Sequence, residues 1–270
     1  MFKKSTWFLM LLLAFGALVS LAVGFAKAIQ VTSSSKTATV TKTIKTESID
    51  KKTVKVVKDS NSFKIAIVGD SIAFGTGDEK ASGFSTYLPN YLKPQTTKKV
   101  TVDNMGINGQ ESAGLLGQLQ SDKPKALIAT ADVVLISIGG NDLRSIRSRN
   151  NASIDQNEYN TIETAYLKNL KEIFQTIRKD NANAYIVFVG LYNPYEKDAP
   201  SYEDTAFMNT WNYSTQKLFE NDAKAIYIPT YDIFKYNLNR YLAKDGLHPN
   251  ALGYQVVSQR IAKSIESILN

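Results

Sequence analysis

The chain contains one histidine, His248, and it lies in the stretch 245–249, which reads Asp-Gly-Leu-His-Pro. A neutral imidazole can act as a general base, and the carboxylate of Asp245, three residues upstream, can orient the ring through Nδ1. A turn that leads into a helix, with Pro249 and Asn250 at its start, explains the same residues without any chemistry. Because the sequence has no second histidine, general-base catalysis by histidine would have to use His248.

Three other groups of small and polar residues each follow an apolar run, and together they offer the remaining parts of a site for acyl transfer from an ester. Ser71 could be the nucleophile, with its own N–H directed at the oxyanion. Asn141 offers a side-chain amide to the same oxygen, and Gly106 offers an unobstructed backbone N–H. Structural alternatives exist for all three, since serine caps helices and glycine and asparagine form turns.

These residues predict a serine hydrolase site. Ser71 is the predicted nucleophile, His248 the base and Asp245 the group that orients and stabilises the imidazolium. The predicted oxyanion hole consists of N–H groups from Ser71, Gly106 and Asn141.

The elements that must position this site alternate along residues 63–270. Short apolar runs predict strands, and segments with helical spacing lie between them. Such an order favours right-handed crossovers and a parallel sheet covered on both faces, with ligands bound beyond the carboxyl ends of the strands. The predicted strands are 64–69, 100–104, 132–138, 184–189 and 225–228, and the predicted helices are about 83–93, 112–120, 156–180, 203–221 and 251–269.

Composition excludes several classes of function. The chain of 270 residues has no cysteine, which excludes disulfides, thiolate zinc sites and a cysteine nucleophile. One histidine excludes a histidine-rich metal site, although carboxylates could still bind a hard cation. Ten of the 32 basic residues but only three of the 25 acidic ones precede Phe63. The excess positive charge therefore belongs to the N-terminal part, and we predict no nucleic-acid partner. We also predict no metal and no cofactor.

The N-terminus predicts export. Lys3 and Lys4 precede an almost unbroken apolar run over 7–26, and Ala26-Lys27-Ala28 resembles a cleavage site. Residues 1–28 are therefore predicted to be a signal peptide or a retained membrane anchor, although a buried core helix is an alternative. Residues 29–62, rich in Ser, Thr and Lys, predict a basic stalk, or a partly ordered β segment. We expect a protein that is secreted or anchored to the outer face of the cell membrane.

The four blocks around the predicted site carry a family resemblance: Gly69-Asp70-Ser71, Gly106, Gly139-Gly140-Asn141-Asp142 and Asp245-Gly246-Leu247-His248. Together they resemble the SGNH (GDSL-type) hydrolases over residues 63–270, in particular exported lysophospholipase- or acylesterase-like members of Gram-positive bacteria. The resemblance implies a three-layer α/β/α sandwich with a flavodoxin-like parallel sheet of about five strands, and the same roles for the residues named above. Ile72 replaces the usual leucine, and Ala73 disfavours the Gly-x-Ser-x-Gly elbow of ordinary α/β-hydrolases.

Two segments are candidates for substrate recognition. Arg144, Arg147 and Arg149 could attract an anionic substrate such as a phospholipid head group or a wall-polymer ester, or could form a solvated loop. The aromatic segment 191–211, which includes Tyr192, could form an acyl-binding wall or a lid, or could pack a helix on the sheet.

We therefore expect an extracytoplasmic serine esterase that hydrolyses an acyl ester (a lipid, a lysophospholipid or a small acyl ester) through an acyl-serine intermediate. One alternative is an O-acetyl esterase or acyltransferase that acts on cell-envelope glycans. A surface binding module with a decayed site is another, but the presence of every catalytic position argues against it. The sequence predicts no oligomeric state.

Overall fold

The computed structural model describes residues 20, 60–80, 82–150, 155–195 and 202–269, and at 147–150 and 202–204 it describes the backbone alone. The chain divides into two units, 1–54 and 55–270. All the elements below belong to the second unit, which contains the predicted site.

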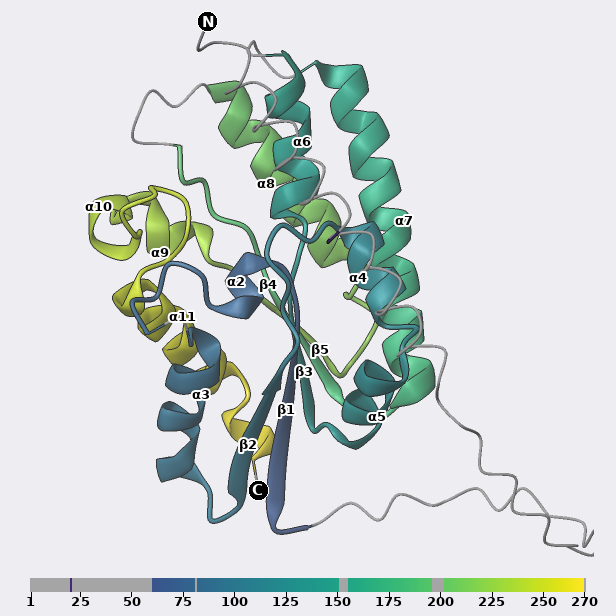
Figure 1. Ribbon diagram of the computed structural model, residues 1–270, viewed down its shortest axis with the longest axis vertical. Helices are drawn as coiled ribbons and strands as arrows, with labels where there is room; N and C mark the ends of the chain where they lie inside the picture. The colour runs from purple at the N-terminus through teal and green to yellow at the C-terminus, as the bar shows by residue number, and fades with distance from the viewer. Residues whose placement is uncertain (1–19, 21–59, 81, 151–154, 196–201, 270) are drawn as a thin grey trace, which may run out of the picture. The chain divides into compact units, whose positions relative to one another are not determined.

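A parallel sheet forms the centre of this unit (Figure 1). Its strand order is β2-β1-β3-β4-β5. All the strands are parallel, but the chain adds β2 on one side of β1 and the later strands on the other side. The register places Gly69, the last residue of β1, opposite Ser137, the last residue of β3. The residues that follow these two strands therefore leave the sheet side by side, at the edge where parallel sheets bind ligands. The strands are β1 (Ser62–Gly69), β2 (Lys99–Asn104), β3 (Val133–Ser137), β4 (Tyr185–Val189) and β5 (Ala225–Ile228).

Helices cover both faces of the sheet. Successive side chains of a strand point to opposite faces, and in the buried strands the side chains on both faces are apolar. One face, with Val68, Ile136 and Phe188, packs against α4 (Ser112–Gln118), α5 (Asp122–Thr130), α6 (Gly140–Asn150), α7 (Gln156–Asp180) and α8 (Tyr202–Lys217). The other face, with Ile67, Leu135 and Val187, packs against α3 (Phe84–Leu92), α9 (Tyr231–Lys235), α10 (Leu238–Tyr241) and α11 (Ala251–Ser264). Figure 1 shows these two helical layers on either side of the strands. The predicted three-layer α/β/α sandwich with five parallel strands is confirmed.

Three further short helices complete the described elements: α2 (Ser71–Phe74) and the 3-10 turns η1 (Lys93–Gln95) and η2 (Glu266–Ile268). The sequence did not predict α5 or α6, nor the short helices α9 and α10. In α6 only Leu143 and Ile146 are apolar, and in α5 the apolar residues are adjacent rather than spaced by a helical turn. The predicted last helix ends earlier, at Ser264, and continues as η2.

The predicted signal or anchor at 1–28, apart from Ser20, lies outside the described residues, as does the predicted stalk up to residue 59. Within the described residues, no helix is both long and apolar enough to cross a membrane.

Candidate active site

Ser71 is presented by a tight turn at the carboxyl end of β1. Gly69 has a φ of +132°, and a Cβ at this position would lie 1.8 Å from the Ser137 carbonyl oxygen, so only glycine fits. Asp70 then caps α2, because its Oδ1 accepts from the Ile72 N–H at 2.9 Å. Ser71 is the first residue of α2, and its N–H has no acceptor among the described residues. An uncommitted N–H at the nucleophile position suits an oxyanion hole.

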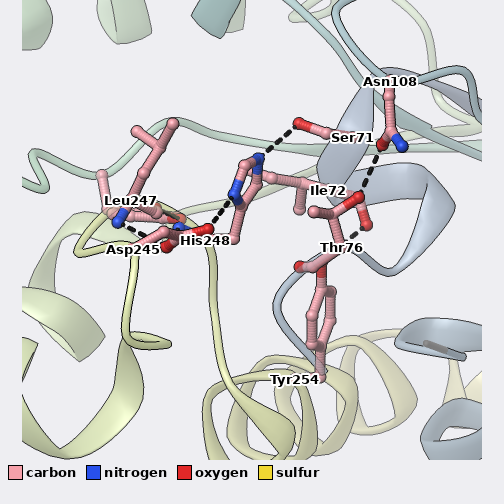
Figure 2. A network of polar contacts seen from close by, with 9 residues as sticks. Ser71, Ile72, Thr76, Asn108, Asp245, Leu247, His248 and Tyr254 are labelled. Atoms are coloured by element: carbon pink, nitrogen blue, oxygen red, sulfur yellow. Dashed lines mark hydrogen bonds and ion pairs between the residues drawn. The ribbon is translucent and has the colours of Figure 1, made fainter. Parts of the chain in front are cut away.

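The lone histidine lies between Ser71 and Asp245 (Figure 2). His248 Nε2 is 2.8 Å from Ser71 Oγ, and His248 Nδ1 is 2.7 Å from Asp245 Oδ2. An ionised carboxylate only accepts hydrogen bonds, so it assigns the ring proton to Nδ1 and leaves Nε2 to accept from the serine hydroxyl. The side chain of His248 is 16% exposed and that of Asp245 is 47% exposed. The structure thus brings together all three predicted catalytic residues.

Asp245 is held in its ionised form by its own turn. Partial burial opposes its ionisation, but hydrogen bonds from the His248 ring and from the N–H groups of Leu247 and His248 outweigh burial and lower the pKa of this carboxyl. Gly246, with a φ of +67°, permits the turn. A carboxylate that stays charged stabilises the imidazolium that forms when the base takes a proton.

The loop that carries His248 is tied down on both sides. The Leu247 carbonyl accepts from the Tyr192 hydroxyl at 2.6 Å, and the His248 carbonyl accepts from the Ala243 N–H at 2.8 Å. Asn250 caps α11, since its Oδ1 accepts from the Gly253 N–H at 2.9 Å. The helix-start interpretation of this stretch is therefore right as well, and it is the reason that the base is fixed in place.

Of the other two predicted oxyanion donors, Asn141 retains this capacity and Gly106 does not. The Asn141 side-chain amide donates one N–H to the Gln110 carbonyl at 2.9 Å, which leaves its second N–H available. The Gly106 N–H donates to Asn104 Oδ1 at 2.9 Å. A Cβ at Gly106 would lie 2.3 Å from the Phe74 nitrogen, so this glycine allows close packing on α2. The structure does not support the predicted oxyanion role of Gly106.

Gly109, which was not among the predicted donors, is the better candidate. Its φ is +75°, no atom lies within 4 Å of the position of a Cβ, and its N–H has no acceptor among the described residues. The Asn108 side chain accepts from Thr76 Oγ1, just beyond α2, while the Gln110 carbonyl accepts from Asn141. Gly109 is thus held between the nucleophile turn and Asn141. The Asn-Gly pair was the available signal, because it favours a positive φ.

Two buried carboxyls support this edge of the sheet. Burial raises the pKa of Asp70 to about 7, against hydrogen bonds from Ile72, Ala73 and Ser137 that favour its ionised form. Burial also raises the pKa of Asp142, which accepts from both the N–H and the hydroxyl of Ser112. The hydrogen bonds between Asp142 and Ser112 join the start of α6 to the start of α4, and they thereby also hold Asn141, the neighbour of Asp142.

A mainly apolar pocket of about 130 Å³ opens beside Ser71 and His248. Of the predicted substrate-binding residues, Arg144 and Tyr192 line it, and the side chain of Arg147 lies outside the described residues, as does that of Arg149. Arg144 is exposed and, within the described part of the chain, forms no ion pair. Apolar lining comes from Ile72, Leu143, Leu191, Pro194, Met208 and Leu247.

The predicted aromatic segment 191–211 divides between two roles. Tyr192 and Tyr195 line the pocket, and the Tyr192 ring also stacks on Phe234 with centroids 3.9 Å apart. Trp211 is fully buried and stacks on Tyr166, so it packs α8 on α7. Residues 196–201 lie outside the described residues. Among the described residues, no group of three or more His, Cys, Asp or Glu side chains could hold a metal ion.

A three-layer fold with a Ser-His-Asp arrangement at the carboxyl edge of its parallel sheet defines a serine hydrolase class of protein. Residues 67–256 match the model of the GDSL-like lipase/acylhydrolase family. The chain therefore belongs to this family, and it is a hydrolase of carboxylic ester bonds.

Relatives resemble the chain in sequence, and solved structures share its fold. The chain is 29% identical over 227 residues to the uncharacterized protein YpmR of Bacillus subtilis, covering 83% of this chain and 89% of the relative. It is 25% identical over 206 residues to the spore germination lipase LipC of Bacillus licheniformis, covering 74% and 95%. A solved lipase from a goat rumen metagenome, Lip_vut3, has the same fold with a TM-score of 0.66 at 21% identity, over 77% of this chain and all of the lipase. The family 3 carbohydrate esterase of Clostridium thermocellum has a TM-score of 0.58 at 20% identity, over 77% and 97%.

Proposed function

We propose that the chain is an extracytoplasmic serine esterase that cleaves short-chain acyl esters through an acyl-Ser71 intermediate. The observation that carries this proposal is the continuous hydrogen-bonded path from Ser71 Oγ through His248 to Asp245, with separations of 2.8 and 2.7 Å. The first distance lies in the range at which a base removes a proton from a nucleophile, and the second is that of a hydrogen bond through which Asp245 orients the base.

In the first half-reaction, Ser71 Oγ attacks the carbonyl carbon of the ester while its proton passes to His248 Nε2. The tetrahedral intermediate collapses when the imidazolium returns this proton to the leaving alkoxide, which departs as the alcohol and leaves the acyl group on Ser71. In the second half-reaction, His248 takes a proton from water, the hydroxide attacks the acyl carbon, and the acid leaves as the proton returns to Ser71. Asp245 keeps its charge throughout and stabilises each imidazolium.

The negative oxygen of both tetrahedral intermediates is bound by three donors in this proposal. They are the N–H of Ser71, the N–H of Gly109 and the second side-chain N–H of Asn141. The first two have no acceptor among the described residues, so they are available to an oxyanion without breaking an existing bond. Removal of one such donor typically costs about 100- to 1,000-fold in kcat.

The pocket volume supports a short acyl group. A cavity of about 150 Å³ holds a molecule of benzene, and the pocket beside Ser71 measures about 130 Å³. We expect acyl groups of up to about six carbons to fill it without any movement of the walls. The small volume of the pocket also favours a second candidate function, which is the removal or transfer of small O-acyl groups on cell-envelope glycans.

The test of this proposal is a series of aryl esters with acyl groups of two to twelve carbons, hydrolysed by the full chain. We expect kcat/KM to be highest at six carbons or fewer, and Ser71→Ala, His248→Ala and Gly109→Ala to be impaired in that order of severity. Equal hydrolysis by Ser71→Ala would refute the proposal. If transfer is the natural reaction, a sugar alcohol added to the assay will accept the acyl group in place of water.

Arg144 supports a substrate that also carries an anionic group, because it lines an apolar pocket and forms no ion pair with any described residue. Arg144→Gln is expected to reduce the preference for aryl hemisuccinate over the neutral aryl butyrate by about fivefold, the strength of an exposed ion pair. Lys179→Gln, which removes an exposed cation from the end of α7, is the matched control. An unchanged preference in Arg144→Gln removes this arginine from the recognition of substrate.

The composition of the N-terminal segment supports a location outside the cytoplasm. We propose that residues 1–28 direct export and that the esterase acts outside the cytoplasm. Alkaline phosphatase fused after residue 62 tests this, because the disulfides of this reporter persist only in an oxidising compartment. The fusion is expected to be active, and an inactive but stable fusion protein would contradict export.

A further inference from the structure

The helix that begins with Ser71 is too short to be stable on its own. α2 has four residues, and isolated helices of this length do not persist in water. Asp70 caps the start of α2. The last carbonyl groups of any helix, however, accept no hydrogen bond from an N–H group of the same helix. In α2 these carbonyls are bound by two side chains that come from different elements, Tyr254 and Asn104.

Tyr254 reaches α2 from the helix that follows the base. Its hydroxyl lies 2.8 Å from the Thr76 carbonyl and 3.2 Å from the Ile72 carbonyl (Figure 2). The residue is fully buried, and its ring meets Phe84 edge-on with centroids 5.1 Å apart, so the hydroxyl has little freedom to move. Because Tyr254 and His248 are six residues apart across the cap of α11, this contact fixes the nucleophile turn relative to the base.

Asn104 reaches the same helix from the end of β2. Its side-chain amide donates to the Ala73 carbonyl at 2.8 Å and to Ser85 Oγ at 2.8 Å, and it lies 3.4 Å from the Phe74 carbonyl. Its Oδ1 accepts the Gly106 N–H at 2.9 Å, so the same side chain also holds the loop that leads to Gly109. One amide thus joins the nucleophile helix to the loop that carries an oxyanion donor.

We propose that Tyr254 and Asn104 are positioning residues, which bind the carbonyl end of α2 and thereby fix Ser71 relative to His248 and to the oxyanion loop, respectively. This inference rests on the proposed function, since it requires Ser71 to be the nucleophile. Neither residue touches the reacting atoms. Each acts by preventing a displacement of the nucleophile, and a displacement of about 1 Å can cost about 100-fold in rate.

The chain offers matched controls for both substitutions. Asn181 makes the same kind of contact at the opposite end of the sheet, where its amide donates to the carbonyls of Ile128 and Ala131 at 2.8 and 2.9 Å. Asn181→Asp therefore removes amide-to-carbonyl hydrogen bonds, as Asn104→Asp does, but far from Ser71. Tyr227→Phe removes a buried hydroxyl that has no hydrogen-bond partner among the described residues, and it is the control for Tyr254→Phe.

The experiment measures kcat and KM on a short aryl ester, the rate of Ser71 labelling by a fluorophosphonate, and the melting temperature, all on the full chain. We expect Tyr254→Phe and Asn104→Asp to lower kcat and the labelling rate by about tenfold or more, with KM changed less than about threefold. The controls are expected to keep kcat, even where Asn181→Asp lowers the melting temperature. Asn104→Ala is measured in parallel in case the new carboxylate prevents folding.

Two results would overturn the inference. One is a lower melting temperature in Tyr254→Phe and Asn104→Asp with wild-type kcat and labelling rate, which would give them a structural role alone. The other is an equal loss of kcat in Asn181→Asp, which would show that general destabilisation is responsible. Ser71→Ala belongs in the same set, because activity in that variant refutes the proposed function itself rather than the positioning roles.

Discussion

Asp70→Asn is expected to make the protein more stable at neutral pH, although it alters the residue next to the nucleophile. Asp70 is 2% exposed, and burial raises its pKa from 3.8 to about 7. Its Oδ1 accepts from Ile72, Ala73 and Ser137, and an asparagine oxygen can accept the same bonds. The substitution therefore keeps the cap on α2 and removes only the cost of burying a charge.

The sign of the effect follows from the proton that the folded state retains. Between pH 3.8 and about 7 the unfolded chain has lost the Asp70 proton and the folded chain still holds it. The free energy of unfolding therefore falls as the pH rises through this window, by about 1.4 kcal/mol per pH unit. Between pH 5 and pH 8 the ionisation of Asp70 should lower the free energy of unfolding of the wild type by about 2–3 kcal/mol. Asp70→Asn lacks this ionisation and should not show that decrease.

The assay is urea unfolding of both proteins at pH 5, 6, 7 and 8, with the free energy extrapolated to water. The carboxyls with lowered pKa values, such as Asp222, Asp232 and Asp245, change their protonation below this range and affect both proteins equally. The difference between variant and wild type is expected to grow with pH and to level off above about pH 7. If the free energies of unfolding of the two proteins change with pH in parallel, or if the variant is less stable at pH 8, burial does not raise the pKa of Asp70 as proposed.

Three further substitutions test the packing around the site. Gly106→Ala would place a Cβ 2.3 Å from the Phe74 nitrogen, so we expect a loss of about 1–3 kcal/mol in urea unfolding and a further loss of kcat because α2 must move. Tyr192→Phe leaves the Leu247 carbonyl without the hydroxyl that lies 2.6 Å away; we expect kcat to fall while KM for a neutral ester stays nearly unchanged, and a change in KM alone would assign Tyr192 to substrate binding. Trp211→Ala empties a fully buried site against Tyr166, and calorimetry should show a loss of about 3–5 kcal/mol with little change in KM.

Much of the fold was predictable because the sheet is buried on both faces. Each strand of such a sheet is a short, nearly continuous apolar run, and this pattern is clear for β1, β3 and β4. The helices α5 and α6 were not predicted, because tertiary contacts rather than helical periodicity stabilise them. Ile128 of α5 and Ile146 of α6 are each buried in the core on the same face of the sheet.

The candidate site was predictable where side chains carry the chemistry. A single histidine left one choice of base, and its neighbours at other strand ends followed from the topology. The backbone donor was not predictable in the same way, because Gly106 and Gly109 both follow β2 and both lack a side chain. Only the structure shows that the first N–H is bound to Asn104 and the second is free of any acceptor among the described residues. The contacts of Tyr254 and Asn104 with α2 depend equally on distances that a sequence does not contain.

Covalent labelling examines the nucleophile itself, because the acyl-serine mechanism requires an activated serine at one known position. A serine-directed fluorophosphonate is incubated with the folded full chain, and the modified peptide is located by mass spectrometry. This mechanism predicts one adduct, on Ser71, with labelling that is greatly slowed in His248→Ala and absent in Ser71→Ala. Hydrolysis of esters by a chain that is not labelled at Ser71, or labelling at Ser71 that is equally fast without His248, would contradict it.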